Sequence, residues 1–261
     1  LLTLKNKNIT DSINYAKRIQ ESLRPSTKIF KKILPESFVF HKPKDIVSGD
    51  FYWVNESEDK VFLAAVDCTG HGVPGAFMSI IGFELFRRIT NQGQIDPGKI
   101  LTHLNRDFEE IFSDVEDMTM RDGMDIALCV FDKKSKELSF AGAFNPMYLI
   151  RDNKLIEFKG NRFSIGLDET DSKEQIFDTH SIAIHPDDVV YIFTDGFADQ
   201  FGGTAGKKFK YRRFRHLLLS IHKKPLDQQA NQLNQSLKNW KGNYDQVDDI
   251  LVIGTNFNNY L

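Results

Sequence analysis

A carboxylate at the end of an apolar run is the feature of this chain that points most directly to chemistry. Residues 61–66 are continuously apolar and are followed by Asp67, after which a glycine-rich turn leads into Pro74 and a segment with helical spacing of apolar residues. Such a run fits a strand buried on both faces, which leaves the Asp67 oxygens free at its end. Glycines allow close approach of a ligand, and proline suits a first helical turn. Taken alone, the motif indicates a metal site or an ordinary strand-to-helix turn.

Three further carboxylate positions resemble that of Asp67. Asp50 enters a β-prone aromatic segment just before the Asp67 strand, and Asp195 ends a second apolar strand before a glycine. The pair Asp248-Asp249 opens the last apolar strand, where an acidic pair is costly unless cations compensate it. Four carboxylate positions without Cys/His ligand spacing favour magnesium or manganese over zinc. We therefore expect these positions to converge on divalent ions.

The order of short motifs resembles the SpoIIE/RsbU-like bacterial branch of the PPM metal-dependent serine/threonine phosphatases. The resemblance covers roughly residues 36–257. The matching motifs are Ser48-Gly49-Asp50-Phe51-Tyr52, Asp67-x-x-Gly70-His71-Gly72, Gly75-Ala76, Gly123-Met124-Asp125, Ala141-Gly142-x-x-Asn145-Pro146, Thr194-Asp195-Gly196 and Asp248-Asp249. Several motifs in the right order are far more specific than any one of them.

The resemblance implies a site with two divalent ions, Mn²⁺ or Mg²⁺. In the family pattern Asp67 bridges both ions, Asp50 and the backbone carbonyl of Cys68 hold one, and Asp195 and Asp248 hold the other. Two ions about 3.5–4 Å apart share a water, lower its pKa and neutralise phosphate oxygens during in-line attack. No nucleophilic side chain is then required, and the Cys68 side chain is expected to pack in the core.

Other candidate site residues leave alternatives open. Either member of the acidic pair can face the metals, and the family match favours Asp248 over Asp249. Lys42 and Lys44 lie where eukaryotic-type PPM enzymes carry a phosphate-gripping arginine; each offers a point charge without bidentate geometry, or is a solvated lysine before an edge strand. His71 is suited to protonate the leaving group or, equally, to support the glycine turn.

Composition allows a soluble enzyme and gives little information about its substrate. The 261 residues are 41% hydrophobic, enough for one large domain, and the formal charge of −2 gives no electrostatic case for nucleic acid. Cys68 and Cys129 sit in apolar settings and read as reduced core residues. No apolar run approaches the roughly 20 residues of a membrane span. Because the chain starts at Leu1, we expect a fragment, either cytoplasmic itself or the cytoplasmic part of a larger sensor protein.

The chain divides near Pro25. Residues 1–25 predict an amphipathic helix in which one face is apolar and the others polar. The apolar face contains Ile9, Ile13, Ala16, Ile19 and Leu23, and the other faces contain Lys17, Arg18, Gln20 and Glu21. This helix is expected either to pack on the phosphatase core or to couple it to a second copy or an upstream sensor domain.

Residues 26–261 predict a phosphatase domain of the α+β class. Hairpins are expected at 124–143 and 147–158, a strand at 176–184, and helices at 74–91, 97–112, 212–222 and 226–240. The glycine-rich segment 197–206 is either a flap or an ordinary loop. The basic and aromatic segment 207–215 reads mainly as a solvated face. The resemblance makes the architecture specific: a central two-sheet antiparallel β-sandwich flanked by helices, with metals at one end.

The resulting functional hypothesis is a metal-dependent phosphatase that hydrolyses phosphoserine or phosphothreonine on a regulatory protein. The resemblance implies a STAS-type anti-anti-sigma factor or a similar partner-switching target. The alternative is a catalytically silent PPM-like scaffold that binds a phosphoprotein, which needs no gathering of negative charge. A metal-dependent nuclease or phosphodiesterase is disfavoured by the near-neutral charge and the ordered motifs.

Overall fold

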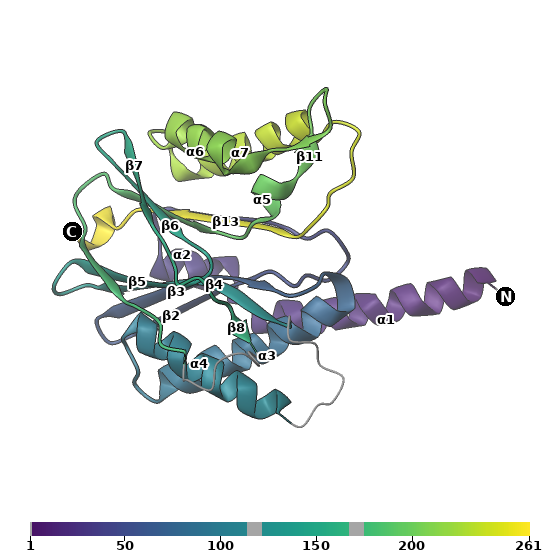
Figure 1. Ribbon diagram of the computed structural model, residues 1–261, viewed down its shortest axis with the longest axis horizontal. Helices are drawn as coiled ribbons and strands as arrows, with labels where there is room; N and C mark the ends of the chain where they lie inside the picture. Colours follow the sequence, from purple (N-terminus) through teal and green to yellow (C-terminus); the bar gives the residue numbers. More distant parts are fainter. Residues whose placement is uncertain (1, 114–121, 167–174) are drawn as a thin grey trace.

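The computed structural model describes residues 2–113, 122–166 and 175–261, which form two facing antiparallel sheets between layers of helices (Figure 1). The first sheet contains, in spatial order, β1 (Ser37–Lys42), β13 (Ile250–Thr255), β10 (Val189–Phe193), β6 (Met147–Arg151) and β7 (Lys154–Phe158). The second contains β2 (Phe51–Ser57), β3 (Lys60–Cys68), β4 (Gly123–Asp132), β5 (Glu137–Ala143) and β9 (His180–Ala183), with β8 (Ile165–Gly166) beside β4. The predicted α+β sandwich is confirmed.

Helices cover the outer face of each sheet. The second sheet is covered by α3 (Gly72–Asn91) and α4 (Pro97–Phe112), and the first by α6 (Lys210–Ile221) and α7 (Leu226–Lys241) (Figure 1). The hydrophobic core therefore has three layers, one between the sheets and one under each pair of helices.

The position of strand β3 in the sandwich explains why its sequence is apolar on both faces. Successive side chains of a strand point to opposite sides. Phe62 and Val66 pack toward α3 and α4, whereas Leu63 and Ala65 pack between the sheets. The strand is central in its sheet, and both faces are buried until Asp67, which is half-buried. A continuous apolar run that stops at a carboxylate is thus what this position requires.

Most predicted elements are present, and one predicted strand is shorter than expected. The hairpins β2–β3, β4–β5 and β6–β7 form as expected. The strand predicted at 176–184 is only β9, because the backbone N–H groups of Phe177 and Asp178 donate to side chains of Thr102 and Asn161 instead of a neighbouring strand. The segment 197–206, expected to be a flap or an ordinary loop, contains regular structure: α5 (Gly196–Asp199) is followed by a hairpin of β11 (Phe201–Gly202) and β12 (Lys207–Lys208).

The structure also contains a short helix that was not predicted from the sequence. Helix α2 (Thr27–Ile33) begins after the Ser26 cap, whose hydroxyl accepts from the N–H of Ile29, and it buries Phe30 and Ile33. Its seven residues are too few to give a clear helical period.

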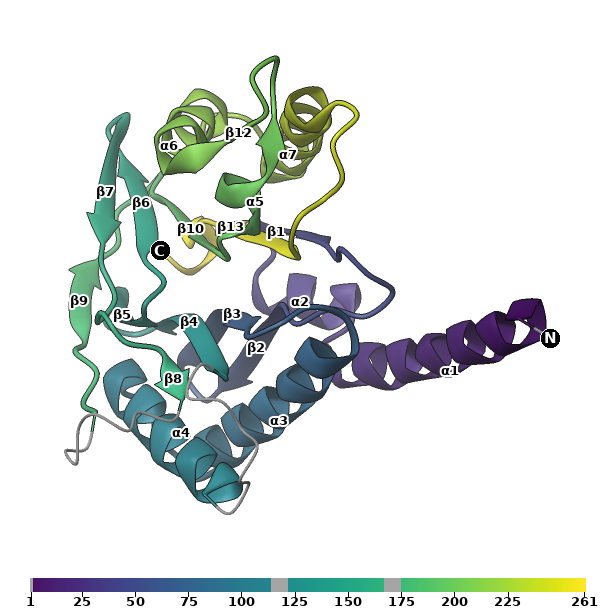
Figure 2. The ribbon, with the colours of Figure 1, turned by 45° about the vertical axis from the view of Figure 1, so that its right-hand side comes forward.

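The N-terminal helix α1 (Leu2–Leu23) is confirmed, but it projects from the body and contacts it near its C-terminal end (Figure 2). Its apolar face is largely exposed, with 58% exposure at Ile9, 44% at Ile19 and 43% at Leu23. The deeply buried side chain of α1 is instead the polar Gln20, which is 5% exposed. Packing of the apolar face on the phosphatase core is therefore wrong for most of its length. Among the described residues, no helix is long and apolar enough to cross a membrane.

Candidate metal centre

Strand directions bring the predicted carboxylates to one end of the sandwich. Asp50 directly precedes β2 and Asp67 lies near the end of β3; the two strands are antiparallel, with Phe51 opposite Val66. Asp195 follows β10 and Asp248 precedes β13, which are also antiparallel neighbours. The start of one strand and the end of its partner are adjacent in each sheet.

A hydrogen bond joins the two sheets at this end. The Thr194 hydroxyl, at the end of β10, donates to Asp50 Oδ2 over 2.6 Å, and the Thr194 oxygen accepts from the N–H of Leu251 at 3.0 Å. Thr194 therefore orients the Asp50 carboxylate across the sandwich. In the sequence, Thr194 stood out only as part of the motif Thr194-Asp195-Gly196. Its hydroxyl beside a strand-end carboxylate was the signal that could have predicted its contact with Asp50.

The carboxylates act on one another electrostatically. Burial, followed by the charge of Asp67, raises the pKa of Asp50, which is 3% exposed. Burial, followed by the charges of Asp195 and Asp125, raises the pKa of Asp67. Burial raises the pKa of Asp195 to about 6, with the charges of Asp199 and Asp248 adding to the effect. The pKa of Asp248 is raised by burial as well.

Buried carboxylates close to one another need a compensating cation, and a divalent ion fits this donor set. Within the described parts of the chain, however, no three Asp, Glu, His or Cys side chains already surround a single point with the spacing of a finished ion site. The two observations are compatible, because carboxylates that repel each other turn apart or share a proton until a cation binds. The strand ends fix the positions of the acids, whereas side-chain torsions adjust easily when a cation binds.

Asp125 is an acidic neighbour that the sequence analysis did not select. It lies in β4 directly opposite Asp67 in β3 and accepts a hydrogen bond from the Ser164 hydroxyl. Its pKa is raised by burial. The motif Gly123-Met124-Asp125 was the sequence signal, but pairing of β3 with β4 was needed to place Asp125 beside Asp67.

The two members of the acidic pair have different surroundings. Both oxygens of Asp249 are engaged by backbone donors: Oδ1 accepts from the N–H of Lys44 at 2.7 Å and Oδ2 from the N–H of Gly49 at 2.8 Å. Asp249 thus ties down the segment that leads into Asp50. Asp248 has a side-chain oxygen that accepts from the N–H of Asp249, and its charge acts on Asp67 and Asp195.

Close backbone packing places the Cys68 carbonyl beside the Asp50 segment. A Cβ atom at Gly49 would lie 3.1 Å from the Cys68 oxygen and 2.5 Å from the Gly70 oxygen, and one at Gly75 would lie 2.1 Å from the latter. Only glycine fits at these two positions. The Cys68 side chain is buried, and burial raises the pKa of its thiol.

Of the remaining candidates, Lys44 and His71 contact each other, whereas Lys42 has different contacts. The Lys44 ammonium donates to His71 Nε2 at 2.8 Å, and His71 Nδ1 donates to Asp45 Oδ2 at 2.7 Å. The charge of Lys44 opposes the effect of burial on the pKa of Asp248. Lys42 is the last residue of β1, paired with Ile250, and its carbonyl accepts from the Gln246 side chain.

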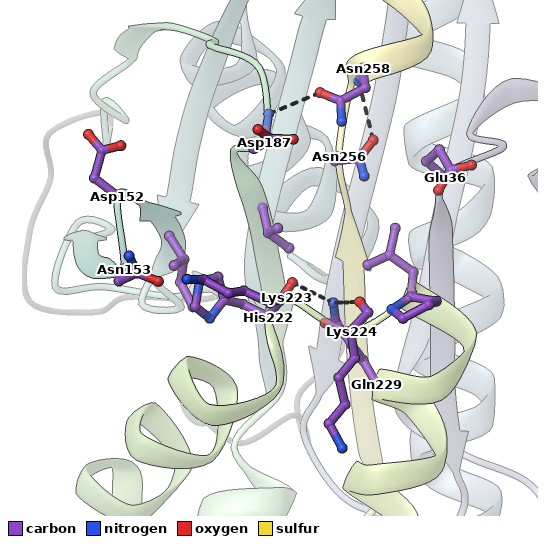
Figure 3. Close-up of a pocket in the computed structure, with 14 residues that line it drawn as sticks. Glu36, Asp152, Asn153, Asp187, His222, Lys223, Lys224, Gln229, Asn256 and Asn258 are labelled. Carbon is purple, nitrogen blue, oxygen red and sulfur yellow. Dashed lines mark hydrogen bonds between the residues drawn. The ribbon is translucent and has the colours of Figure 1, made fainter.

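A cavity of about 650 Å³ lies at the other end of the first sheet (Figure 3). It is lined by Val189 and Asn256, at the ends of β10 and β13 that are remote from the carboxylates. The Gln229 amide in this cavity donates to the carbonyls of His222 and Lys224, as Figure 3 shows. Its polar groups largely stabilise turns, and it contains none of the predicted site residues.

The fold and the acidic end of the sandwich define a PP2C-type domain. The structure matches the SiaA-PP2C domain of Pseudomonas aeruginosa with a TM-score of 0.86 and 33% identity, covering 97% of this chain and 98% of that one. It also matches the PP2C phosphatase domain, with a fragment of the regulatory domain, of the cell fate determinant SpoIIE from Bacillus subtilis, with a TM-score of 0.68, 17% identity, and 85% and 63% coverage.

Sequence comparison gives the family. The phosphoserine phosphatase RsbU of Bacillus subtilis (strain 168) is 26% identical over 190 residues, which are 72% of this chain and 53% of RsbU. The chain thus spans about half the length of this relative. The family model described as stage II sporulation protein E (SpoIIE) matches residues 57–258. The chain belongs to the SpoIIE family.

Proposed function

We propose that this chain is a metal-dependent serine/threonine protein phosphatase that acts on a phosphorylated regulatory protein. The observation that carries the proposal is a group of buried and half-buried carboxylates at one end of the sandwich, whose pKa values are raised by burial and by the charges of neighbouring acids. Such an arrangement is unfavourable by itself and becomes favourable when cations bind. Membership of the SpoIIE family and the similarity to a phosphoserine phosphatase support the same reaction class.

The proposed ligands are those that the family resemblance implies. The charges of Asp195 and Asp248 act on Asp67, which supports Asp67 as the candidate shared by two ions. Asp50 and the Cys68 carbonyl would hold one ion, and Asp195 and Asp248 the other. Divalent ions supply an acidic water and neutralise phosphate charge. RsbX, which has the same fold with a TM-score of 0.58 and 15% identity, has been crystallised with magnesium.

Asp249 is proposed as a structural residue. Its two oxygens hold the N–H groups of Lys44 and Gly49, so it fixes the segment before Asp50. This assignment favours Asp248 as the ligand of the pair.

The proposed context is partner switching in the cytoplasm. One structural neighbour combines RsbU and RsbW domains, and RsbU itself is named a phosphoserine phosphatase. The substrate class we propose is therefore a STAS-type anti-anti-sigma factor or a similar regulator. Residues 1–25 are proposed to couple residues 26–261 to a sensor domain or a second copy, because the apolar face of α1 is exposed.

The test is hydrolysis of p-nitrophenyl phosphate and of a phosphoserine peptide, with and without manganese. Wild-type protein should release phosphate only with added metal, and Asp67→Asn should not. Rapid-quench samples should contain no phosphorylated enzyme, because water attacks directly.

A silent scaffold gives a different result in the same experiment. It would bind a phosphorylated partner but release no phosphate at any metal concentration. That outcome would replace the phosphatase proposal by the scaffold alternative.

A further inference from the structure

We propose that Asp45 is a positioning residue, which acts through His71 to aim the Lys44 ammonium at the phosphate group of a substrate. The proposal rests on the phosphatase function proposed above. The three side chains form a continuous hydrogen-bonded row, with 2.7 Å between Asp45 Oδ2 and His71 Nδ1 and 2.8 Å between His71 Nε2 and Lys44 Nζ. Asp45 was not selected from the sequence.

The partners of His71 fix its tautomer. A lysine ammonium is only a donor, so His71 Nε2 must be the acceptor of the Lys44 bond. The ring proton is then on Nδ1, where it is donated to the Asp45 carboxylate. With its Nε2 lone pair occupied, the imidazole presents no proton on this side. The group that offers N–H donors at this position is Lys44, which keeps two of its three for an incoming oxyanion.

Lys44 is held at both ends. Its backbone N–H donates to Asp249 Oδ1 at 2.7 Å, and its ammonium is held by His71. A lysine side chain normally loses substantial rotamer entropy when it is ordered, so a side chain that is already fixed binds a ligand at a smaller entropic cost. Asp248 lies within electrostatic reach of both Lys44 and His71, which places the row at the edge of the carboxylate group.

The start of α3 makes room for Asp45. Gly72 has φ of +66°, and a Cβ atom there would lie 3.2 Å from Asp45 Oδ2. His71 caps α3 without a side-chain bond to the helix, which leaves its ring free for Asp45 and Lys44. The segment before Asp50 and the turn after β3 are therefore joined by side chains as well as by close backbone packing.

The row has little structural value, which makes it testable. The side chains of His71 and Asp45 are 48% and 45% exposed, and polar contacts between exposed side chains contribute little to stability. Substitutions in the row should leave the fold intact. A matched control is Asp59→Asn, because Asp59 is 40% exposed, pairs with Lys134 and lies at the opposite end of β3.

The experiment measures binding of inorganic phosphate by isothermal titration calorimetry at saturating Mg²⁺. Compared with wild type, Lys44→Met should weaken binding about tenfold, Asp45→Asn about three- to fivefold, and Lys44→Arg much less than Lys44→Met. The double variant Asp45→Asn/Lys44→Met should match Lys44→Met, because Asp45 acts through Lys44. Asp59→Asn should bind like wild type, and all melting temperatures should be unchanged.

Turnover of p-nitrophenyl phosphate supplies the second readout. Asp45→Asn should raise KM more than it lowers kcat. Unchanged phosphate affinity in Asp45→Asn, multiplicative losses in the double variant, or no phosphate binding by wild type would each overturn the positioning role. If wild type binds phosphate with the expected variant pattern but never hydrolyses an ester, the phosphatase function fails and the positioning role stands.

Discussion

Replacing Asp195 by asparagine is expected to stabilise the ion-free protein while it abolishes metal-dependent activity. Burial, with the charges of Asp199 and Asp248, raises the pKa of Asp195 from 3.8 to about 6. The folded state therefore holds this proton more tightly than the unfolded state does. The associated stability is fully present below about pH 4 and is lost as the pH rises through 6.

The magnitude follows from the size of the rise. Each pKa unit corresponds to about 1.36 kcal/mol, so a rise from 3.8 to about 6 costs the ion-free protein at most about 3 kcal/mol at neutral pH. Asp195 is only half-buried, and solvent screening reduces this figure to about 2 kcal/mol. Asparagine has nearly the same shape and carries no charge, so the variant escapes this cost.

The assay is urea unfolding in EDTA at pH 4.5 and pH 7.5. Asp195→Asn should exceed wild type by about 2 kcal/mol at pH 7.5 and by about a third of that at pH 4.5. Saturating Mn²⁺ should reverse the order, because wild type gains the free energy of ion binding. Asp188→Asn is the matched control, since Asp188 is 1% exposed but paired with Arg151, and its loss should destabilise the protein. A variant less stable than wild type in EDTA at pH 7.5, or a difference independent of pH, would refute this reasoning.

Three further variants test a metal ligand, the Gln20 contact and the exposed face of α1. Asp67→Asn should lower metal-dependent kcat more than any other single ligand change, as steady-state kinetics will show, because both ions lose a shared ligand. Gln20→Ala should cost roughly 1–3 kcal/mol in urea unfolding and weaken Mn²⁺ binding, because the Gln20 amide bonds both the C=O and the N–H of Ser48, at 2.6 and 3.2 Å. Ile13→Asp with Ile19→Asp should weaken self-association or coupling in sedimentation experiments but leave basal activity intact; a lower melting temperature without a change in oligomeric state would refute the coupling role.

The sequence predicted the positions of residues in helices and strands, because hydrophobic periodicity identifies those elements. Asp67 was found because β3 is apolar on both faces, so its first carboxylate stands out. Gln20 was assigned to a polar face because periodicity assumes that a helix attaches through its apolar side, whereas α1 contacts the body through an amide. Asp45 could not be found, because its bond to His71 spans 26 residues and depends on how two loops pack. Asp249 differs from Asp248 only through backbone donors in the segment before β2.

The glycine contacts at positions 49 and 75 have a consequence for how this domain can diversify. Near the carboxylates, the main chain of three segments packs closely together: the residues that lead into β2, the turn after β3 and the first turn of α3. Main-chain spacing does not depend on which side chains surround it. Exposed side chains near this site are therefore free to change and to suit a new phosphoprotein while the spacing between acids is preserved. A side chain larger than hydrogen at either glycine would act as a wedge that spreads the acids apart.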